Sequence, residues 1–100
     1  MVTTEILNKI KKRLGLPESV NVYDEEFMDL IEGAIFDMKE SGVPDILLDT
    51  QTPNPQVINC IAFFVKMERA ENEKESKRYE KLYEKYVFRL AMCNEGAVSL

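Results

Sequence analysis

The 100-residue sequence contains no histidine and only two cysteines. Without histidine, the chain lacks the commonest general base, the commonest metal ligand and the usual sensor of physiological pH. Cys60 and Cys93 form no CxxC pair, so no set of zinc ligands exists. A disulfide between them is one alternative, but we expect free thiols because Cys60 lies in an apolar run, where it acts as a small hydrophobic residue. We therefore expect no metal and no cofactor.

Long apolar runs and catalytic motifs are also missing. The most apolar stretch, residues 57–67, includes Asn59 and Lys66 and is only 11 residues long, whereas a membrane-spanning helix needs about 20. No serine has a histidine partner or a GxSxG context, and no glycine-rich phosphate loop occurs. Carboxylates such as Asp29 and Glu32 share a helix face, but ferritin-like sites also require histidine. These absences predict that the chain is not an enzyme, has no catalytic residues and contacts no membrane.

What is present describes one small helical domain. A chain of 100 residues with 45% hydrophobic content fits a single domain over residues 1–100, since domains have roughly 50–250 residues. Apolar residues at helical spacing predict helices at about residues 4–14, 24–41, 54–70 and 73–93. The predicted fold class is therefore all-α, a four-helix domain with a long loop between the second and third helices. We expect residues 94–100 to form a flexible tail.

Local signals predict where these helices begin and end. Gly15 and Gly42, each followed two residues later by proline, predict the ends of the first and second helices, and Asn54 before Pro55 predicts the start of the third. Gly33 costs about 1 kcal/mol relative to alanine inside a helix, so it predicts close contact with another helix. The third helix is apolar on nearly all sides, which predicts a central position or a surface covered by another chain. Asn72 favours a break between the last two helices, but one long bent helix remains an alternative.

Charge is distributed unevenly along the chain. Residues 1–17 hold four basic and one acidic side chain, residues 18–49 hold one and ten, and residues 50–100 hold eight and seven, for a net charge of −5. The basic cluster at Lys9, Lys11, Lys12 and Arg13 suits either phosphate contacts or the end of a helix, and we favour the second interpretation. With so few cations, we expect duplex DNA to bind no more tightly than about 10⁻⁴ M.

The segment 66–85 mixes seven basic and six acidic residues. Pairs such as Glu73–Lys77, Lys77–Glu80 and Lys81–Glu84 have the spacing that stabilises an exposed helix surface. The same pattern suits charged edges that set the register between identical subunits. The sequence does not choose between these interpretations.

The order of these elements resembles the small head-tail connector (head-completion adaptor) proteins of tailed phages and prophages. The likeness covers residues 4–92. It rests on Lys12-Arg13-Leu14-Gly15-Leu16, on the acidic start Asp24-Glu25-Glu26-Phe27, on Leu30 to Ile35, and on Pro55-Gln56-Val57 through Val65. The short segment after residue 93 and the composition of the loop at residues 43–53 depart from the family pattern, which bears on the partner contacts.

The resemblance implies a non-enzymatic adaptor that forms a ring of about a dozen copies between the portal and the tail or head-closure protein. It implies that DNA passes through the ring without specific binding, and that the protein resides in the virion and, during assembly, in the cytoplasm of the bacterial host. The alternative is a small acidic helical interaction or regulatory protein unrelated to virion assembly.

One loop carries the candidate protein interface. Ile46, Leu47 and Leu48 are three consecutive apolar residues between Pro44 and Asn54, where periodicity assigns them no core face. Two interpretations stay open: the loop folds onto the bundle, or these residues contact a neighbouring subunit or the portal.

Overall fold

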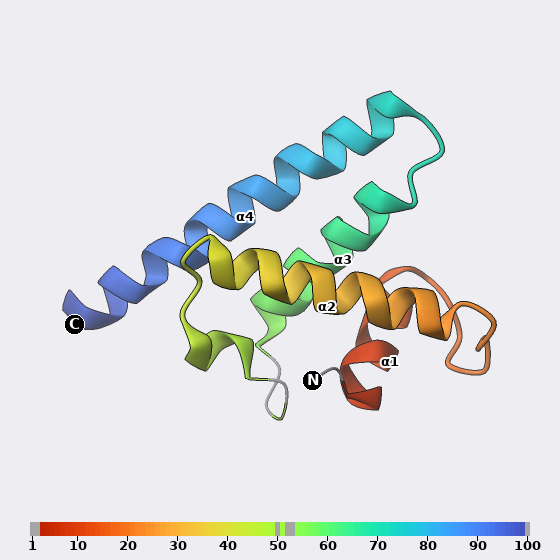
Figure 1. Cartoon of the computed structure of the whole chain (residues 1–100), viewed down its shortest axis with the longest axis horizontal. Coiled ribbons are helices and arrows are strands. Elements are labelled where there is room, and N and C mark those ends of the chain that lie inside the picture. Colours follow the sequence, from red (N-terminus) through yellow and green to blue (C-terminus); the bar gives the residue numbers. More distant parts are fainter. Residues whose placement is uncertain (1–2, 50, 52–53, 100) are drawn as a thin grey trace.

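A computed structural model describes residues 3–49, 51 and 54–99, with side chains as far as Met92. The described residues form four α-helices, α1 (Thr4–Arg13), α2 (Asp24–Glu40), α3 (Pro55–Glu68) and α4 (Glu73–Ser99), and contain no β-strand (Figure 1). The all-α prediction with four helices is confirmed.

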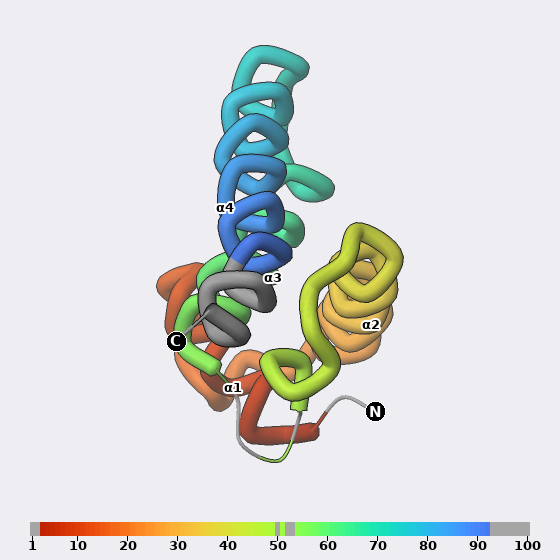
Figure 2. Tube along the Cα trace, turned by 90° about the vertical axis from the view of Figure 1, so that its left-hand side faces the viewer, coloured from red at the N-terminus to blue at the C-terminus, as the bar shows by residue number. Residues whose placement is uncertain are grey.

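The centre of the domain is α3, as its apolar sequence predicts. It packs against α1, α2 and α4, and α4 turns back to run antiparallel beside it (Figure 1). Figure 2 shows α2 lying apart from α4, and both helices pack against α3. The buried residues of α3 are Val57, Ile58, Cys60, Ile61, Ala62 and Val65. Because three helices bury their apolar faces against α3, this helix organises the hydrophobic core.

The first two helices end as the glycines predict. Gly15 has φ +78° and Gly42 has φ +98°, in the left-handed region that side chains disfavour. In both turns the N–H after the glycine donates to the carbonyl oxygen five residues earlier, at 2.8 Å for Leu16 and 3.0 Å for Val43. This is the Schellman motif, which satisfies carbonyl groups that the helix end leaves without partners.

Three polar side chains cap the starts of helices. The side-chain oxygens of Thr3, Asn54 and Asn72 accept hydrogen bonds from backbone N–H groups two or three residues later, at 3.2, 2.8 and 2.8 Å respectively. Pro55 occupies the first turn of α3, where its missing N–H has no cost. The cap at Asn72 separates α3 from α4, so the alternative of one long bent helix is wrong.

One predicted helix boundary and the predicted loop between α2 and α3 differ from the structure. The predicted end of the fourth helix at residue 93 was wrong, because α4 continues to Ser99; Gly96 weakens a helix but does not end it, and no proline follows. Leu100 and the side chains after Met92 lie outside the described residues, and a flexible tail at 94–100 stays a prediction. The loop between α2 and α3 contains a one-turn 3₁₀ helix, Asp45–Leu48. A single turn is too short to produce a repeating apolar pattern, so the sequence did not predict it.

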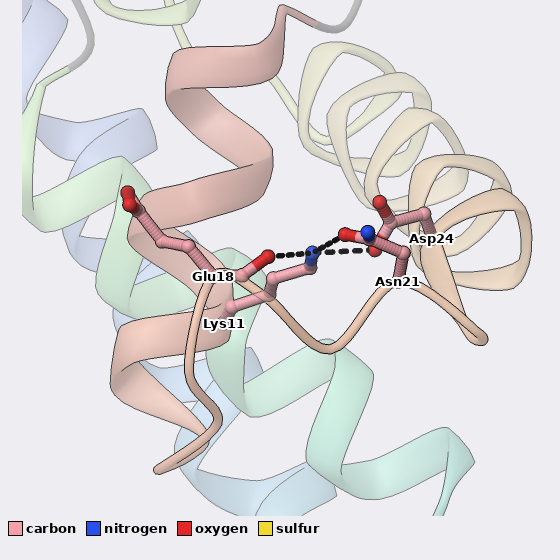
Figure 3. Close-up of polar contacts among 4 residues, drawn as sticks. All are labelled: Lys11, Glu18, Asn21 and Asp24. Atoms are coloured by element: carbon pink, nitrogen blue, oxygen red, sulfur yellow. Dashed lines mark hydrogen bonds and ion pairs between the residues drawn. The ribbon is translucent and has the colours of Figure 1, made fainter.

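A buried lysine ties the connection between α1 and α2 (Figure 3). Lys11 is only 1% exposed, and its Nζ lies 2.6 Å from Asp24 Oδ1 at the start of α2. The same ammonium donates to the backbone oxygen of Glu18 at 3.2 Å and to Asn21 Oδ1 at 3.4 Å. Buried charges need such partners, so this cluster fixes both the entry to α2 and the path of the connection.

Gly33 lies where α2 meets α3, but the contact leaves room for a side chain. A Cβ at this position would lie 3.9 Å from Phe64 Cε2, which is ordinary van der Waals contact. The predicted helix contact is present, whereas the requirement for glycine is not.

Candidate interaction surface

An open groove runs between α2 and α4, with α3 at its base. It has a volume of about 750 Å³. Phe36 of α2 and Phe88 of α4 line it, and each is 66% exposed. Phe64 and Tyr83 contribute aromatic surface, so the groove combines apolar walls with acidic side chains. The acidic lining residues are Asp37, Glu80 and Glu84. Exposed aromatic residues gathered at one groove are typical of a surface that contacts another protein.

Tyr83 and Asp37 bridge the two helices that flank the groove. The Tyr83 hydroxyl donates a hydrogen bond to Asp37 Oδ2 at 2.7 Å. Burial, followed by this bond and the charge of Asp37, raises the pKa of Tyr83 above its usual range. The phenol is therefore neutral at physiological pH and holds α2 and α4 in position rather than taking part in acid–base chemistry.

Cys60 lies beneath this bridge. Its thiol is free and buried, and Sγ contacts the backbone oxygen of Tyr83 at 3.9 Å. Burial, with the nearby charge of Asp37, raises the pKa of Cys60 to about 12. Since the thiolate is the reactive form, this cysteine is packed as a small hydrophobic residue and is not an active nucleophile. The side chain of Cys93 lies outside the described residues.

Aromatic rings and cations lie along the contact between α3 and α4. The Phe63 ring stacks between Tyr79 and Tyr86, with centroids 6.4 and 5.4 Å away. The Arg78 guanidinium lies 5.3 Å from the centre of the Tyr79 ring, and that of Arg89 lies 5.6 Å from the centre of the Tyr86 ring. Cation–π contacts of this kind stabilise by about 0.5–1 kcal/mol at exposed sites. These contacts also hold Arg78 and Arg89 on the outer surface of α4.

The predicted interface residues divide between the core and the surface. Leu47 and Leu48 are partly buried against the hydrophobic core, whereas the neighbouring Ile46 is 83% exposed. The loop therefore folds onto the bundle through two of the three residues and presents the third to solvent. A role for them in contacting other proteins stays a prediction.

The basic cluster near residue 11 does not form one surface patch. Lys11 points into the core, and Arg13 Nε donates to Asn59 Oδ1 on α3 at 2.6 Å. Lys9 and Lys12 remain exposed. Lys11, Lys12 and Arg13 lie in the last turn of α1, as the structural interpretation expects, and Lys11 in addition pairs with Asp24.

The structure and the comparisons narrow the function classes. Within the described ranges, no three His, Cys, Asp or Glu side chains lie close enough to hold a metal ion. The same part of the chain contains no helix with the length and apolar character needed to cross a membrane.

Residues 6–97 match the family model described as phage connector protein. The search of curated proteins and the search of solved structures found no match.

Sequence reasoning did not identify Phe36 and Phe88 as surface residues of interest. Each lies among charged residues on an amphipathic helix, at a position outside the apolar stripe. A large aromatic residue on the charged face of a helix is the signal that would have found them.

Proposed function

Because the chain belongs to the phage connector protein family, we propose that it forms a ring between the portal and the tail of a tailed phage or prophage, through which DNA passes. Members of this family are structural proteins, so the chain has a structural role in the phage particle. The single observation that carries the proposal is the family match over residues 6–97, nearly the whole domain. The same match disfavours a regulatory protein unrelated to virion assembly.

The proposed partners are about a dozen copies of the chain itself, the portal protein, and a tail or head-closure protein. Exposed apolar side chains support this proposal. Phe36, Phe88 and Ile46 are 66%, 66% and 83% exposed, and such residues are candidates for burial at an interface. We assign Ile46 to contact with a neighbouring subunit or the portal, with Leu47 and Leu48 supporting the loop from beneath.

The proposed relation to DNA is passage without specific binding. A net charge of −5 disfavours tight attachment to a polyanion. Each phosphate that a protein neutralises adds a salt-dependent attraction, so a channel with few cations lets the DNA slide. The assembled ring would reside in the virion, after assembly in the cytoplasm of the bacterial host.

Assembly with the portal tests this function. The purified chain is mixed with the portal protein of the same phage, and the products are measured by native mass spectrometry and electron microscopy. We expect a closed ring of about a dozen copies seated on the portal. A chain that stays monomeric at every concentration, alone and with the portal, would contradict the proposal.

A further inference from the structure

Two stripes of opposite charge lie on the outer faces of α2 and α4. The acidic stripe has Phe36 among its carboxylates and consists of Glu25, Asp29, Glu32, Phe36 and Glu40. The basic stripe consists of Lys74, Arg78, Lys81, Lys85 and Arg89. All ten side chains are exposed.

The two stripes have the same spacing. In each, consecutive members are four, three, four and four residues apart, which places them on one face of a helix. Each stripe is about 22 Å long, because an α-helix rises 1.5 Å per residue. Two helices that carry stripes of equal length and opposite sign can lie side by side with their charges paired.

Among the side chains that the structure describes, none forms an ion pair with either stripe. Among the described residues, the ion pairs are Lys11–Asp24, Arg69–Glu26 and Lys77–Glu73, and none of them includes a stripe residue. The expected pair Lys81–Glu84 does not form, and Lys77 pairs with Glu73 rather than with Glu80. Lys39 is the one basic side chain of α2, and it lies beside the acidic stripe rather than within it.

One copy of the chain cannot bring its own stripes together. Both α2 and α4 pack on α3 through their apolar faces, and each stripe is on the exposed side of its helix. In Figure 2 the two helices lie apart from each other. A contact between the stripes must therefore join two copies, and a contact between two different surfaces can repeat from copy to copy and forms a ring where its rotation closes.

We propose that the acidic stripe of one copy docks against the basic stripe of the next and forms the repeating subunit interface. This inference rests on the proposed ring. Exposed ion pairs contribute little individually, so the stripes set orientation and salt dependence. Phe36 within one stripe and Phe88 beside the other are each 66% exposed and supply apolar surface to bury.

Charge reversal tests the pairing. The equal spacing places Asp29 opposite Arg78 and Glu32 opposite Lys81 when the two helices run in the same direction. In Asp29→Lys/Glu32→Lys the two altered positions repel the cations opposite them, and in Arg78→Glu/Lys81→Glu they repel the carboxylates opposite them. We expect each variant to raise the concentration of half-assembly about 100-fold, measured by sedimentation velocity at low salt. Controls with equal changes in net charge outside the stripes are Glu5→Lys/Glu18→Lys and Lys9→Glu/Lys12→Glu, and these should assemble as the wild type does.

Mixing the two stripe variants gives the sharpest outcome. In an alternating arrangement every interface joins unlike charges, so an equimolar mixture should recover assembly, as should one chain with all four changes. Thermal unfolding of each variant verifies that the monomer is folded. Raising the salt concentration should weaken wild-type assembly.

The outcomes separate this inference from the proposed function. Wild-type rings together with unaffected stripe variants, or a mixture that does not recover, would overturn the stripe pairing and leave the ring. A wild type that never assembles would overturn both. If Arg78→Glu/Lys81→Glu assembles normally but loses retention of duplex DNA, the basic stripe faces nucleic acid and the pairing is wrong.

Discussion

The connections before and after α2 begin with the same motif and are then held in different ways. Each starts with a left-handed glycine and a proline two residues later, and each has a strongly exposed aliphatic side chain, Val22 at 78% or Ile46 at 83%. The first connection packs Leu16 against the core and is also fixed by a buried ammonium group. The second is held by apolar contacts of Val43, Leu47 and Leu48 with the core.

This difference shows that a helix-stop motif does not determine the path that follows it. The ammonium of Lys11 requires oxygen partners in one arrangement, because an unpaired buried charge is unstable. Apolar contacts are less directional, so the loop after α2 can adjust while it still covers the core. This contrast supports the proposal that the second connection, rather than the first, contacts a partner. The variants below test this contrast, beginning with the largest expected effect on stability.

Loss of the buried ammonium should have the largest effect. Lys11→Ala should lower the free energy of unfolding by about 3–5 kcal/mol, because it leaves Asp24 without its partner and opens a cavity. Denaturant unfolding followed by circular dichroism measures this change. The control is the double variant Lys11→Met/Asp24→Asn, which keeps the volume, removes both charges and should recover most of the stability. A loss below about 1 kcal/mol in Lys11→Ala would show that the ion pair does not fix the first connection.

Loss of the apolar support beneath the second connection should have the next largest effect. Leu47→Ser/Leu48→Ser should lower the free energy of unfolding by about 2–3 kcal/mol, less than for two fully buried leucines because both side chains are partly exposed. The melting temperature should fall by about 10 °C. An unchanged melting temperature with lost ring assembly would instead place both residues in an interface. If neither stability nor assembly changes, the loop is a solvated linker.

Replacing the two glycines should have smaller and nearly equal effects. Gly15→Ala and Gly42→Ala should each lower the free energy of unfolding by about 1 kcal/mol, since both residues have positive φ and an added Cβ finds ordinary space. Gly33→Ala is the matched control within α2 and should raise stability by about 0.5–1 kcal/mol. Unequal effects at Gly15 and Gly42, seen in thermal melts, would show that the shared motif is not equivalent in the two connections.

The exposed apolar residues should have the smallest effect on stability. Ile46→Ser and Val22→Ser should each change the free energy of unfolding by less than about 0.5 kcal/mol, because both side chains are largely solvated. Only Ile46→Ser should weaken ring assembly, as measured by light scattering with the portal protein. Weakened assembly in both variants, or in Val22→Ser alone, would contradict the assignment of the second connection as the contact.

The features that could be predicted from the sequence are those with local causes. Glycine at the end of a helix, asparagine before proline, and an apolar stripe all act within a few residues, and the structure confirms them at Gly15, Asn54 and α3. The burial of Lys11 was not predicted, because its partner Asp24 is on another helix and no local pattern reveals such a pair. The surface features were harder to predict for the same reason. Phe36 and Phe88 line one groove only after α2 and α4 have packed on α3.

The central claim, a structural adaptor between head and tail, is tested most directly in the phage that encodes this chain. The gene is removed, and the particles are examined by electron microscopy with the chain supplied in trans as the control. We expect heads that have packaged DNA but are not joined to tails, and joined particles when the chain is restored. Normal numbers of joined, infectious particles without the chain would contradict it.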